Sequence, residues 1–371
     1  MGGDRDGSWD RTAPVVAVTE MDRRTFLMRA AKVGAGAAAI GLGTGIWIGS
    51  SRKPWDASAF PPIRSARVAV VRADSYDGPL EELVIDGLRS IGAEVGGRSV
   101  LLKPNLVEYD ARTVINTDPR LVAATVLALR RLGAASVGVG EGPGHRRDTQ
   151  FVGDSSGLFE ALRRVDAPFL DLNTSPLVEV PLRSSFTSLG KLWLPEPVVA
   201  ADVVVSMPKL KTHHWAGATL SLKNCFGCVP GRVYGWPKNV LHWAGLEQAI
   251  VDVAAAVRPE LQIVDGIVGM QGDGPIRGTP ITSGVLMFGT DPVATDTTAA
   301  MVMGLDPAKI GYLADAARFL GQGHPERIHQ VGEDPERSAS SFELLDRFAW
   351  MKAGSGRPRP ASEERPSAGP A

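Results

Sequence analysis

The sequence predicts an α/β fold, in which a mostly parallel sheet carries helices on both of its faces. Short runs of β-branched and other apolar residues recur along the chain, which is typical of strands that are buried on both faces. Segments that open with Asp-Pro and continue with helical spacing alternate with these runs. With 44% hydrophobic residues among 371, the chain can also enclose a sizeable core between two layers of helices.

The first half of the chain alternates strands and helices. In chain order, the expected elements are a strand at 67–72, a helix at 80–91, a strand at 99–102, a helix at 119–132 and a strand at 135–140. Asp118 is suited to cap the second helix, because its carboxylate can accept hydrogen bonds from backbone N–H groups and Pro119 favours the first helical position.

The second half repeats this pattern. Apolar runs at 202–206, 262–264 and 284–288 predict three further strands, and Asp291-Pro292 opens another helix. In sheets of this kind a ligand binds beyond the carboxyl ends of the strands. A functional site is therefore expected in the segments that follow the strands.

One α/β domain is expected over residues 65–350. Around it we expect a non-structural N-terminal extension at 1–20, an export signal or anchor at 21–49, a proline-containing linker at 50–64 and a disordered tail at 351–371. The prediction for the tail follows from its composition, which lacks the apolar residues needed to pack.

The N-terminal segment resembles a twin-arginine export signal. Arg23 and Arg24 precede Thr25-Phe26-Leu27, and an uncharged stretch rich in glycine and alanine follows at 33–49. We therefore expect the twin-arginine translocation machinery as a partner, and an extracytoplasmic location that is either periplasmic or at the cell surface. If the segment is not cleaved, it would anchor the domain to the membrane.

The composition excludes some classes of function. The formal net charge of −1 lacks the basic excess of a general nucleic-acid binder, so no nucleic-acid partner is expected. Two cysteines are too few for a disulfide framework or for a four-thiolate iron–sulfur site. The cofactor is therefore unknown at this point, and no iron–sulfur module is expected.

Lysines follow several of the expected strands, namely Lys103, Lys209, Lys211 and Lys223. Each lies in an otherwise apolar motif, and clustered ammonium groups repel one another unless an anion lies between them. The natural counterpart is a small anionic ligand that carries phosphate or carboxylate, with Asn105 and Asn224 beside it. Two alternatives remain: solvated charges at the rim, and a desolvated lysine that serves as a base or forms a Schiff base.

Carboxylates and glycines follow the later strands. Asp265 and Asp273 lie in a glycine-rich segment, where Gly272 and Gly274 let the backbone turn tightly or approach a ligand. Asp296 lies among apolar residues of the last expected helix, where an unpaired carboxylate is costly, so it needs a lysine partner or a hard cation. One hypothesis is a divalent metal held by these three aspartates, since magnesium and calcium favour oxygen ligands.

A histidine pair and a Cys-x-x-Cys pair lie in the middle region. His213 and His214 would point in opposite directions along an extended chain, so at most one is expected to face the crevice, as a proton carrier near neutral pH. Cys225 and Cys228 could form a disulfide, ligate zinc with the histidines, act as a redox dithiol, or pack as small buried thiols. Residues 231–239 (GRVYGWPKN) are expected to form an exposed flap.

Several short motifs occur at these strand ends in a fixed order. They are KPN at 103–105, TDP at 117–119, KLKTH at 209–213, SLKNCFG at 221–227, DGIVGMQGDGPIRG at 265–278 and DPVATD at 291–296. In these motifs the chain resembles the domain of unknown function 362 family, over residues 68–332. The resemblance implies no assigned reaction. Some members carry a ferredoxin-like four-cysteine module beside this domain, and this sequence contains none.

Together these features favour an exported enzyme that acts on a small anionic molecule. The residues expected to carry the chemistry are Lys209, Lys211, His213, Asp265 and Asp273, and those expected to bind the ligand are Lys103, Asn105, Lys223, Asn224, Gly272 and Gly274. One alternative is a redox or metal-binding protein that uses Cys225 and Cys228. Another is a protein that binds an anion without catalysis.

Overall fold

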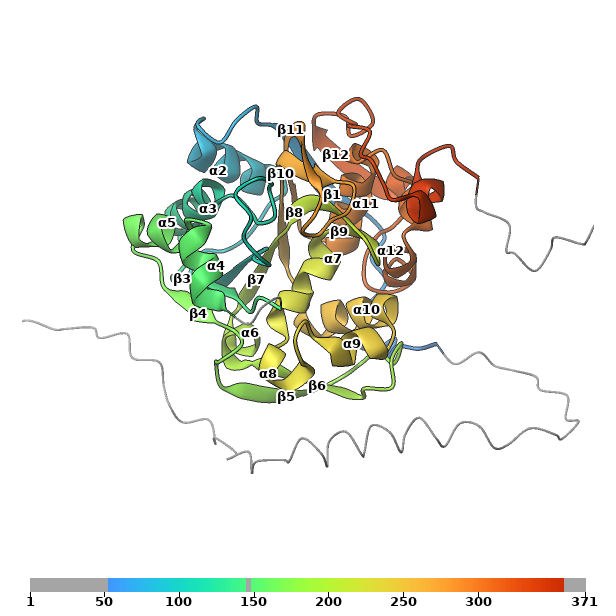
Figure 1. The fold of residues 1–371 in the computed structure, drawn as a ribbon, viewed down its shortest axis with the longest axis horizontal. Helices are drawn as coiled ribbons and strands as arrows, with labels where there is room; N and C mark the ends of the chain where they lie inside the picture. Colours follow the sequence, from blue (N-terminus) through green and yellow to red (C-terminus); the bar gives the residue numbers. More distant parts are fainter. Residues whose placement is uncertain (1–52, 145–147, 357–371) are drawn as a thin grey trace, which may run out of the picture. The chain divides into compact units, whose positions relative to one another are not determined.

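A ten-stranded sheet runs through the described part of the chain, which comprises residues 53–144 and 148–356 of this computed structural model (Figure 1). Its strands are β1 (Ala66–Arg72), β2 (Ser99–Pro104), β3 (Ser136–Glu141), β4 (Phe169–Asp171), β7 (Val203–Met207), β8 (Lys209–His213), β9 (Gly217–Thr219), β10 (Leu261–Gln271), β11 (Thr279–Gly289) and β12 (Ile328–Gly332). A separate antiparallel pair consists of β5 (Leu177–Pro181) and β6 (Lys191–Pro195).

The large sheet is mostly parallel, as the sequence predicts. Its main path follows the order β12-β1-β11-β10-β7-β2-β3-β4, and β8 pairs with both β10 and β9. Only β11, which lies between β1 and β10, and β9, which pairs with β8, run antiparallel to their neighbours. The central strands are buried on both faces, and every residue of β7 is buried.

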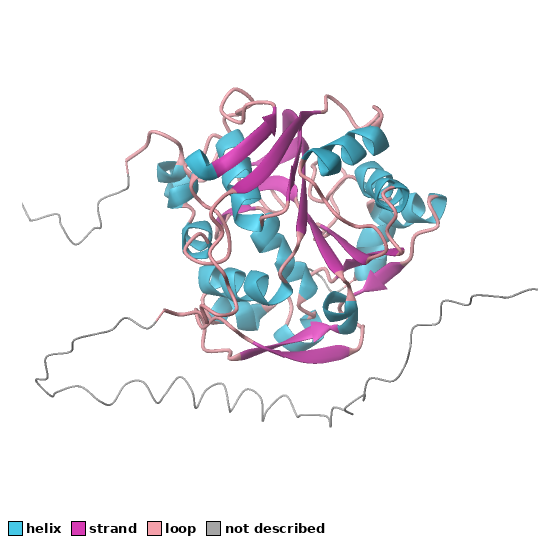
Figure 2. Ribbon diagram, turned by 180° about the vertical axis from the view of Figure 1, so that it is seen from behind, coloured by secondary structure: helices cyan, strands magenta, loops and turns pink. Residues whose placement is uncertain are grey.

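Helices cover both faces of the sheet, which confirms the predicted fold class (Figure 2). One face packs against α2 (Leu80–Ser90), α3 (Pro119–Arg131), α4 (Thr149–Ser155) and α5 (Leu158–Arg164). The other packs against α6 (Glu196–Ala200), α7 (Ser221–Asn224), α8 (Gly231–Tyr234), α9 (Asn239–Trp243), α10 (Leu246–Val257), α11 (Pro292–Val302) and α12 (Gly311–Ala316). Short 3-10 helices are η1 (Cys225–Cys228), η2 (Pro307–Lys309), η3 (Pro325–Arg327) and η4 (Asp346–Met351).

The helix starts that the sequence marks with Asp-Pro are capped as predicted. The Asp118 carboxylate accepts a hydrogen bond from the Arg120 N–H at the start of α3. The Asp291 carboxylate accepts hydrogen bonds from the N–H groups of Val293 and Ala294 at the start of α11. A cap of this kind stabilises a helix by about 1 kcal/mol, so each Asp-Pro pair favours the helix start that it marks.

Two segments expected to be loops are strands. Lys209–His213 forms β8 instead of a loop after β7, and β10 continues to Gln271 instead of ending at residue 264. The two strands lie so close together that a Cβ added at Gly269 would be 2.6 Å from the Leu210 carbonyl oxygen. Glycines that suggested a turn therefore permit a close approach between β8 and β10.

Packed structure extends into both regions that were expected to flank the domain. In the expected linker, the Trp55 ring stacks on Phe319 with 4.9 Å between ring centroids. In the expected tail, Met351 is buried and Lys352 forms an antiparallel β-bridge with Leu305. The packed part of the chain therefore extends beyond residues 65–350 at both ends.

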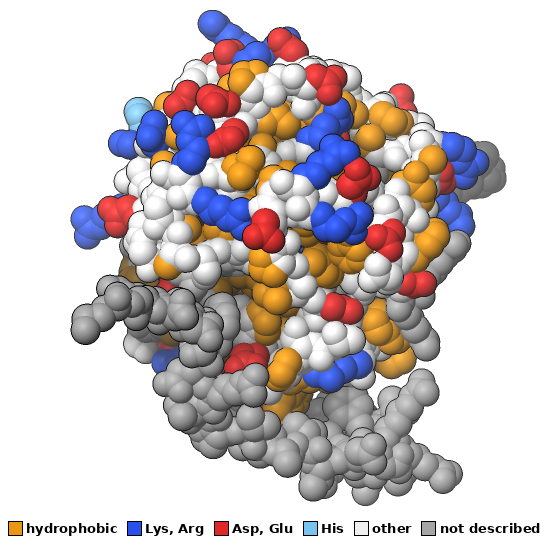
Figure 3. Space-filling model, turned by 90° about the vertical axis from the view of Figure 1, so that its left-hand side faces the viewer, with side chains coloured by type: hydrophobic (Ala, Val, Ile, Leu, Met, Phe, Trp, Pro, Cys, Tyr) orange, Lys and Arg blue, Asp and Glu red, His pale blue; other side chains and the backbone are white. Residues whose placement is uncertain are grey.

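The expected signal segment, with Arg23 and Arg24, lies outside the described residues. Within the described ranges, no helix is both long and apolar enough to cross a membrane. On the face shown in Figure 3, the described basic and acidic side chains are interspersed. That face therefore offers no continuous basic strip to a phosphate backbone.

Candidate functional site

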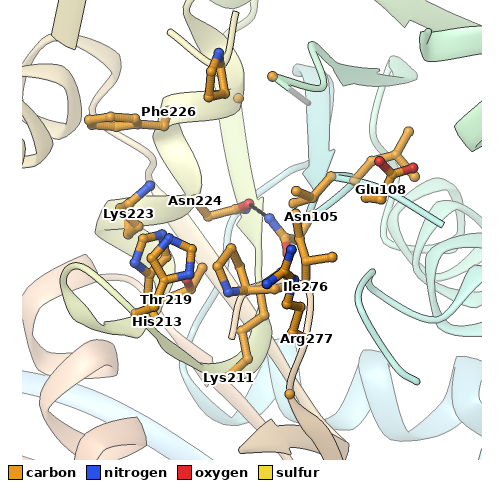
Figure 4. A pocket seen from close by; sticks show the side chains of 18 of the residues that line it. Asn105, Glu108, Lys211, His213, Thr219, Lys223, Asn224, Phe226, Ile276 and Arg277 are labelled. Carbon is orange, nitrogen blue, oxygen red and sulfur yellow. Dashed lines mark hydrogen bonds between the residues drawn. The ribbon is translucent and has the colours of Figure 1, made fainter. Parts of the chain in front are cut away.

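A cavity of about 960 Å³ lies at the carboxyl ends of β2 and β3, beside β8 and α7 (Figure 4). Lysines and arginines outnumber carboxylates on its walls. The charged lining residues are Lys103, Glu108, Asp110, Arg112, Glu141, Lys211, Lys223, Lys238, Asp273, Arg277 and Arg347. The cavity thus occupies the edge of the sheet where the sequence predicts a ligand crevice.

The Lys103 ammonium is fully engaged by the protein. It forms a buried ion pair with Glu141, and also donates to the carbonyl of Pro104 at 2.7 Å and to Asn224 Oδ1 at 3.0 Å. Gly227 lies directly against this ion pair, and any side chain at that position would clash with both partners. Lys103 therefore lines the cavity with its charge already balanced.

Two buried oxygens on the cavity wall lack a hydrogen-bond partner among the described residues. They are Asn105 Oδ1 and Thr219 Oγ1. Asn105 is held in place through its Nδ2, which donates to Asn224 Oδ1 at 3.2 Å. Buried polar atoms are normally satisfied, so these two oxygens are positions at which a ligand or water would form hydrogen bonds.

Lys211 is buried without a carboxylate partner in the described part of the chain. Its ammonium donates to the backbone carbonyl of Ile115 at 2.8 Å and to that of Pro275 at 3.5 Å. Burial, followed by the charges of Lys223 and Lys209, holds the pKa of Lys211 well below its usual range. Keeping Lys211 protonated in this buried position therefore costs free energy, and a bound anion would lower that cost.

Lys223 has the least constrained amine of the cavity lysines. Its Nζ lies 4.2 Å from the centroid of the Phe226 ring and has no hydrogen-bond acceptor among the residues that the structure describes. Burial, followed by the charges of Lys238 and Lys103, lowers the pKa of Lys223 to about 7. The amine is thus partly neutral near physiological pH.

Lys238 was not predicted as a site residue. It has a left-handed backbone conformation (φ 68°) and is buried, and its ammonium donates to the carbonyls of Gly142, at 2.8 Å, and Phe226. Burial lowers its pKa to about 8. The expected exposed flap at 231–239 is therefore wrong at this position, because Lys238 folds inward and lines the cavity.

The histidines also depart from the prediction, because His213 and His214 both line the cavity. β8 ends at His213, so the alternation of an extended strand does not continue to His214. His213 Nδ1 accepts hydrogen bonds from the backbone N–H of Trp215 at 3.0 Å and of Ala216 at 3.2 Å. The ring hydrogen is therefore on Nε2, and burial holds the pKa of His213 well below its usual range.

His242 has the opposite tautomer. Its Nδ1 lies 3.0 Å from the Lys238 carbonyl oxygen, which can only accept, so the hydrogen is on Nδ1. Nε2 then keeps a free electron pair on a ring that lines the cavity. Burial lowers the pKa of His242, which keeps the ring neutral. The sequence prediction of a single proton carrier missed this residue.

Lys209 and Asp265, which were predicted to be catalytic, lie outside the cavity lining. Lys209 Nζ is 2.6 Å from Asp265 Oδ2 and 2.9 Å from the Tyr76 hydroxyl oxygen, and donates to the Val268 carbonyl at 3.0 Å. Tyr76 in turn donates to Asp265 Oδ1 at 2.6 Å. We call these three side chains the Lys209 cluster, and its buried charges are balanced within the protein.

The three aspartates of the metal hypothesis do not form one site. Asp265 belongs to the Lys209 cluster, Asp273 lines the cavity 3.8 Å from His214 Nδ1, and Asp296 is buried on α11. Across the described ranges, no group of three or more His, Cys, Asp or Glu residues could hold a metal ion. The expected aspartate metal site and the zinc alternative are therefore not assembled.

Asp296 is held by backbone N–H groups, and no lysine among the described residues pairs with it as the sequence had suggested. Its carboxylate accepts hydrogen bonds from the backbone N–H of Ser221 at 2.7 Å and of Leu222 at 2.9 Å. These N–H groups open α7, so the carboxylate holds the helix that presents Lys223. Burial raises the pKa of Asp296, the hydrogen bonds lower it, and the net result is a pKa of about 7.

The predicted ligand-binding glycines shape a turn instead of lining the cavity. Gly272 has a φ of 77°, and its carbonyl accepts a hydrogen bond from Thr212 Oγ1 at 2.9 Å. Gly274 packs against the Thr212 backbone, where a side chain would clash, and its carbonyl accepts from the His214 N–H at 2.7 Å. The turn thereby places Asp273 and Pro275 on the cavity wall.

Cys225 and Cys228 are free thiols, and both are buried. Burial raises the pKa of Cys225 well above its usual range and that of Cys228 to about 12. Neither residue lines the cavity. The thiols are therefore protonated packing groups, as in the last of the four sequence alternatives.

Comparison with known proteins places the chain in a family. The family described as "Domain of unknown function (DUF362)" matches residues 100–301. This chain belongs to that family. A relative, the "Thylakoid-associated protein sll1697" of Synechocystis sp. (strain ATCC 27184 / PCC 6803 / Kazusa), is 30% identical over 270 residues, which cover 68% of this chain and 79% of the relative.

The similarity of this chain to solved structures is weaker. The lactate racemase apoprotein from Thermoanaerobacterium thermosaccharolyticum matches with a TM-score of 0.41 and 12% identity, over 64% of this chain and only 57% of that one. A protein from Thermotoga maritima matches with a TM-score of 0.31 and 12% identity, over 72% of this chain and 91% of that one. At these TM-scores, neither likeness bears on the chemistry of the DUF362 cavity.

Proposed function

We propose that this DUF362 protein is an enzyme that binds an organic anion in the cavity and transfers a proton on it. The observation that carries the proposal is the pair Lys211 and Lys223, two cavity cations that form no ion pair with a described residue. Buried cations without a counter-charge are costly, and like charges repel. An anion between them would offset both effects.

The size and the walls of the cavity favour an organic anion over an inorganic one. About 960 Å³ lies in the range of sites for organic ligands and far exceeds the volume of a single phosphate. Apolar side chains line the same walls, among them Leu106, Trp215, Phe226 and Ile276. The proposed ligand therefore has an acidic group and an apolar body.

Proton transfer is proposed because the neutral groups on the walls have complementary roles. The free electron pair of His242 Nε2 can take a proton, and so can the neutral form of Lys223. His213 Nε2–H can only donate a hydrogen bond while its Nδ1 is occupied. A bound anion would thus meet a proton acceptor and a fixed donor in one cavity.

The binding proposal is tested by thermal unfolding with three probes at equal ionic strength: phenyl phosphate, inorganic phosphate and phenol. Phenyl phosphate is expected to raise the Tm more than either of the other two, since only it has both an acidic group and an apolar body. A ligand at 100 times its Kd stabilises the folded state by about 2.7 kcal/mol. A Tm rise no larger than that caused by sodium chloride would contradict the proposal.

Proton transfer is tested separately, with phenylpyruvate in deuterium oxide. Enzyme-dependent deuterium incorporation at carbon, measured by mass spectrometry, is the expected result. Stabilisation by anions together with no incorporation for any of a panel of 2-oxo acids would instead favour the alternative of a non-catalytic anion-binding protein.

We also propose that the protein is exported by the twin-arginine machinery, on the basis of Arg23, Arg24 and the uncharged stretch at 33–49. A membrane-related location is in keeping with the name of the thylakoid-associated relative. The double variant Arg23→Lys with Arg24→Lys is expected to remain in the cytoplasm, while the control Arg29→Lys is exported. Equal fractionation of both variants would contradict this proposal.

A further inference from the structure

The four cavity lysines differ in what their amines contact. Lys103 is paired with Glu141, Lys211 donates to two backbone carbonyls, and Lys238 donates to two others. Within the described chain, only the Lys223 amine contacts no acceptor and rests against an aromatic ring. Three of the amines are thus fixed by the protein, and one remains available to a ligand.

The surroundings of Lys223 keep its amine reactive. Six titratable groups interact electrostatically with the Lys223 amine, namely Lys103, Lys211, Lys238, His213, His214 and His242. All of them are cationic or neutral, so none favours protonation of the amine, and burial lowers its pKa to about 7. At pH 7 the neutral fraction is then about 10³ times that of an ordinary lysine with a pKa of ~10.4.

The rest of the wall supplies groups for a ligand that reaches Lys223. Figure 4 shows Lys223, Thr219 and His213 on one side of the cavity, with Arg277 and Ile276 on the other. The Thr219 hydroxyl has no partner among the described residues, and His213 offers Nε2–H. A ligand whose acidic group lies beside Lys211, with Arg277 on the same cavity wall, could therefore place a second polar group at Lys223.

We infer that Lys223 forms a covalent imine with a carbonyl group of the bound anion, so that the substrate class is an organic acid or phosphate ester that carries an aldehyde or ketone. This inference rests on the proposed function. The amine electron pair forms a bond to the carbonyl carbon, and the carbonyl oxygen leaves as water. One proton is taken up from solvent, which leaves a protonated imine on Lys223.

Such an imine would give the site its chemistry. A protonated imine withdraws electrons from the adjacent carbon, and a hydrogen on that carbon becomes easier to remove. His242 Nε2, which keeps a free electron pair on the cavity wall, can accept that proton. Lys223 and His242 thus have distinct roles, as the covalent group and the base.

The test uses full-length protein at pH 7 with two anionic carbonyl probes, glyoxylate and pyridoxal phosphate, each followed by sodium borohydride. Borohydride reduces an imine to a stable secondary amine, and peptide mass spectrometry then locates the adduct. We expect the modified fraction at Lys223 to exceed that at exposed Lys191 at least tenfold for one or both probes. Phenyl phosphate should compete with the reaction.

Two variants show whether an adduct depends on the Lys223 amine. Lys223→Arg keeps a cation but has no nucleophilic amine, so it should bind phenyl phosphate and give no adduct at residue 223. Lys191→Met is the matched control, since Lys191 is exposed and pairs with Glu179 outside the cavity, and it should react as the wild type does. Thermal unfolding of each variant establishes that it is folded.

The outcomes separate the inference from the function on which it rests. If phenyl phosphate stabilises the protein but both probes modify only surface lysines, the imine is wrong and the organic-anion site stands. If neither stabilisation nor an adduct at Lys223 occurs, both proposals are wrong. An adduct at Lys223 that phenyl phosphate does not compete away would also contradict the inference.

Discussion

Lys209 and Lys211 lie two residues apart on β8, and both are buried, yet they are in opposite electrostatic situations. The Lys209 ammonium meets the Asp265 carboxylate and the Tyr76 hydroxyl. Among the described residues, the Lys211 ammonium donates to backbone carbonyls and pairs with no carboxylate, and Lys211 lines the cavity. A buried cation without a counter-charge is costly, and for Lys211 the counter-charge under the proposed function is a bound anion.

The same contrast separates the other two predicted lysines. Lys103 resembles Lys209, since Glu141 balances its charge inside the protein. Lys223 resembles Lys211, because no carboxylate in the described part of the chain pairs with it. Under the proposed function the two lysines with a carboxylate partner support the fold and the two without one bind the ligand, so burial alone does not distinguish the two kinds of lysine.

The largest effect is expected where a balanced charge is broken. Lys209→Met leaves the Asp265 carboxylate buried without its cation, which should lower the free energy of unfolding by about 3–5 kcal/mol. Chemical denaturation of the variant and the wild type measures this difference. The double variant Lys209→Met with Asp265→Asn should recover part of the loss, because it removes the unpaired charge. If Lys209→Met alone were as stable as the wild type, the Asp265 ion pair would not distinguish Lys209 from Lys211.

A smaller effect is expected from pH. Lys223 has a pKa of about 7 in the folded state and ~10.4 when unfolded, so between these values the unfolded chain binds more protons. Stability should therefore rise with pH across that window, and Lys238, with a pKa of about 8, contributes with the same sign. Lys223→Met should reduce the slope by up to about 1.4 kcal/mol per pH unit.

Denaturation of the wild type and Lys223→Met at pH 7, 8 and 9 gives this slope. Ionisations elsewhere are common to both proteins and cancel in the difference. Parallel stability curves for the two proteins would mean that Lys223 is an ordinary solvated lysine. Lys223 could then no longer be grouped with Lys211 as a buried lysine without a counter-charge.

The smallest effect is expected at the surface. Lys191 pairs with Glu179 at 2.6 Å, but both side chains are about half exposed, at 51% and 42%. Lys191→Met should change the free energy of unfolding by only about 0–1 kcal/mol, since water and salt screen such pairs. Denaturation at low and high salt provides the measurement. A loss as large as that of Lys209→Met would show that burial is not what distinguishes the two ion pairs.

The fold could be predicted from the sequence because its signals are local. The apolar runs of β1 and β7 and the Asp-Pro starts at Asp118 and Asp291 each act within a few residues. The edge of the sheet that holds the cavity followed from the same elements, so Lys103, Lys211 and Lys223 were correctly expected to lie there.

The pairing of charges could not be predicted, because it depends on distant segments. Asp265 lies 56 residues from Lys209 in the sequence, and nothing in the KLK motif indicates which lysine it meets. Asp296 accepts hydrogen bonds from backbone N–H groups of α7, whereas its place among apolar residues had suggested a lysine or a cation. Lys238 was missed because residues 231–239 were expected to form an exposed flap, and its inward position depends on a left-handed backbone conformation at Lys238 itself.

The central claim is that Lys223 is an unbalanced cation held for an anionic ligand. The most direct test measures Lys223→Met twice, by denaturation without ligand and by calorimetric titration with phenyl phosphate. Without ligand the variant should be as stable as the wild type or more stable, because the loss of a buried like charge removes repulsion. Its affinity for phenyl phosphate should fall by about 1.5–3 kcal/mol, or roughly ten- to hundredfold. A variant that is less stable without ligand and binds phenyl phosphate as well as the wild type does would contradict the claim.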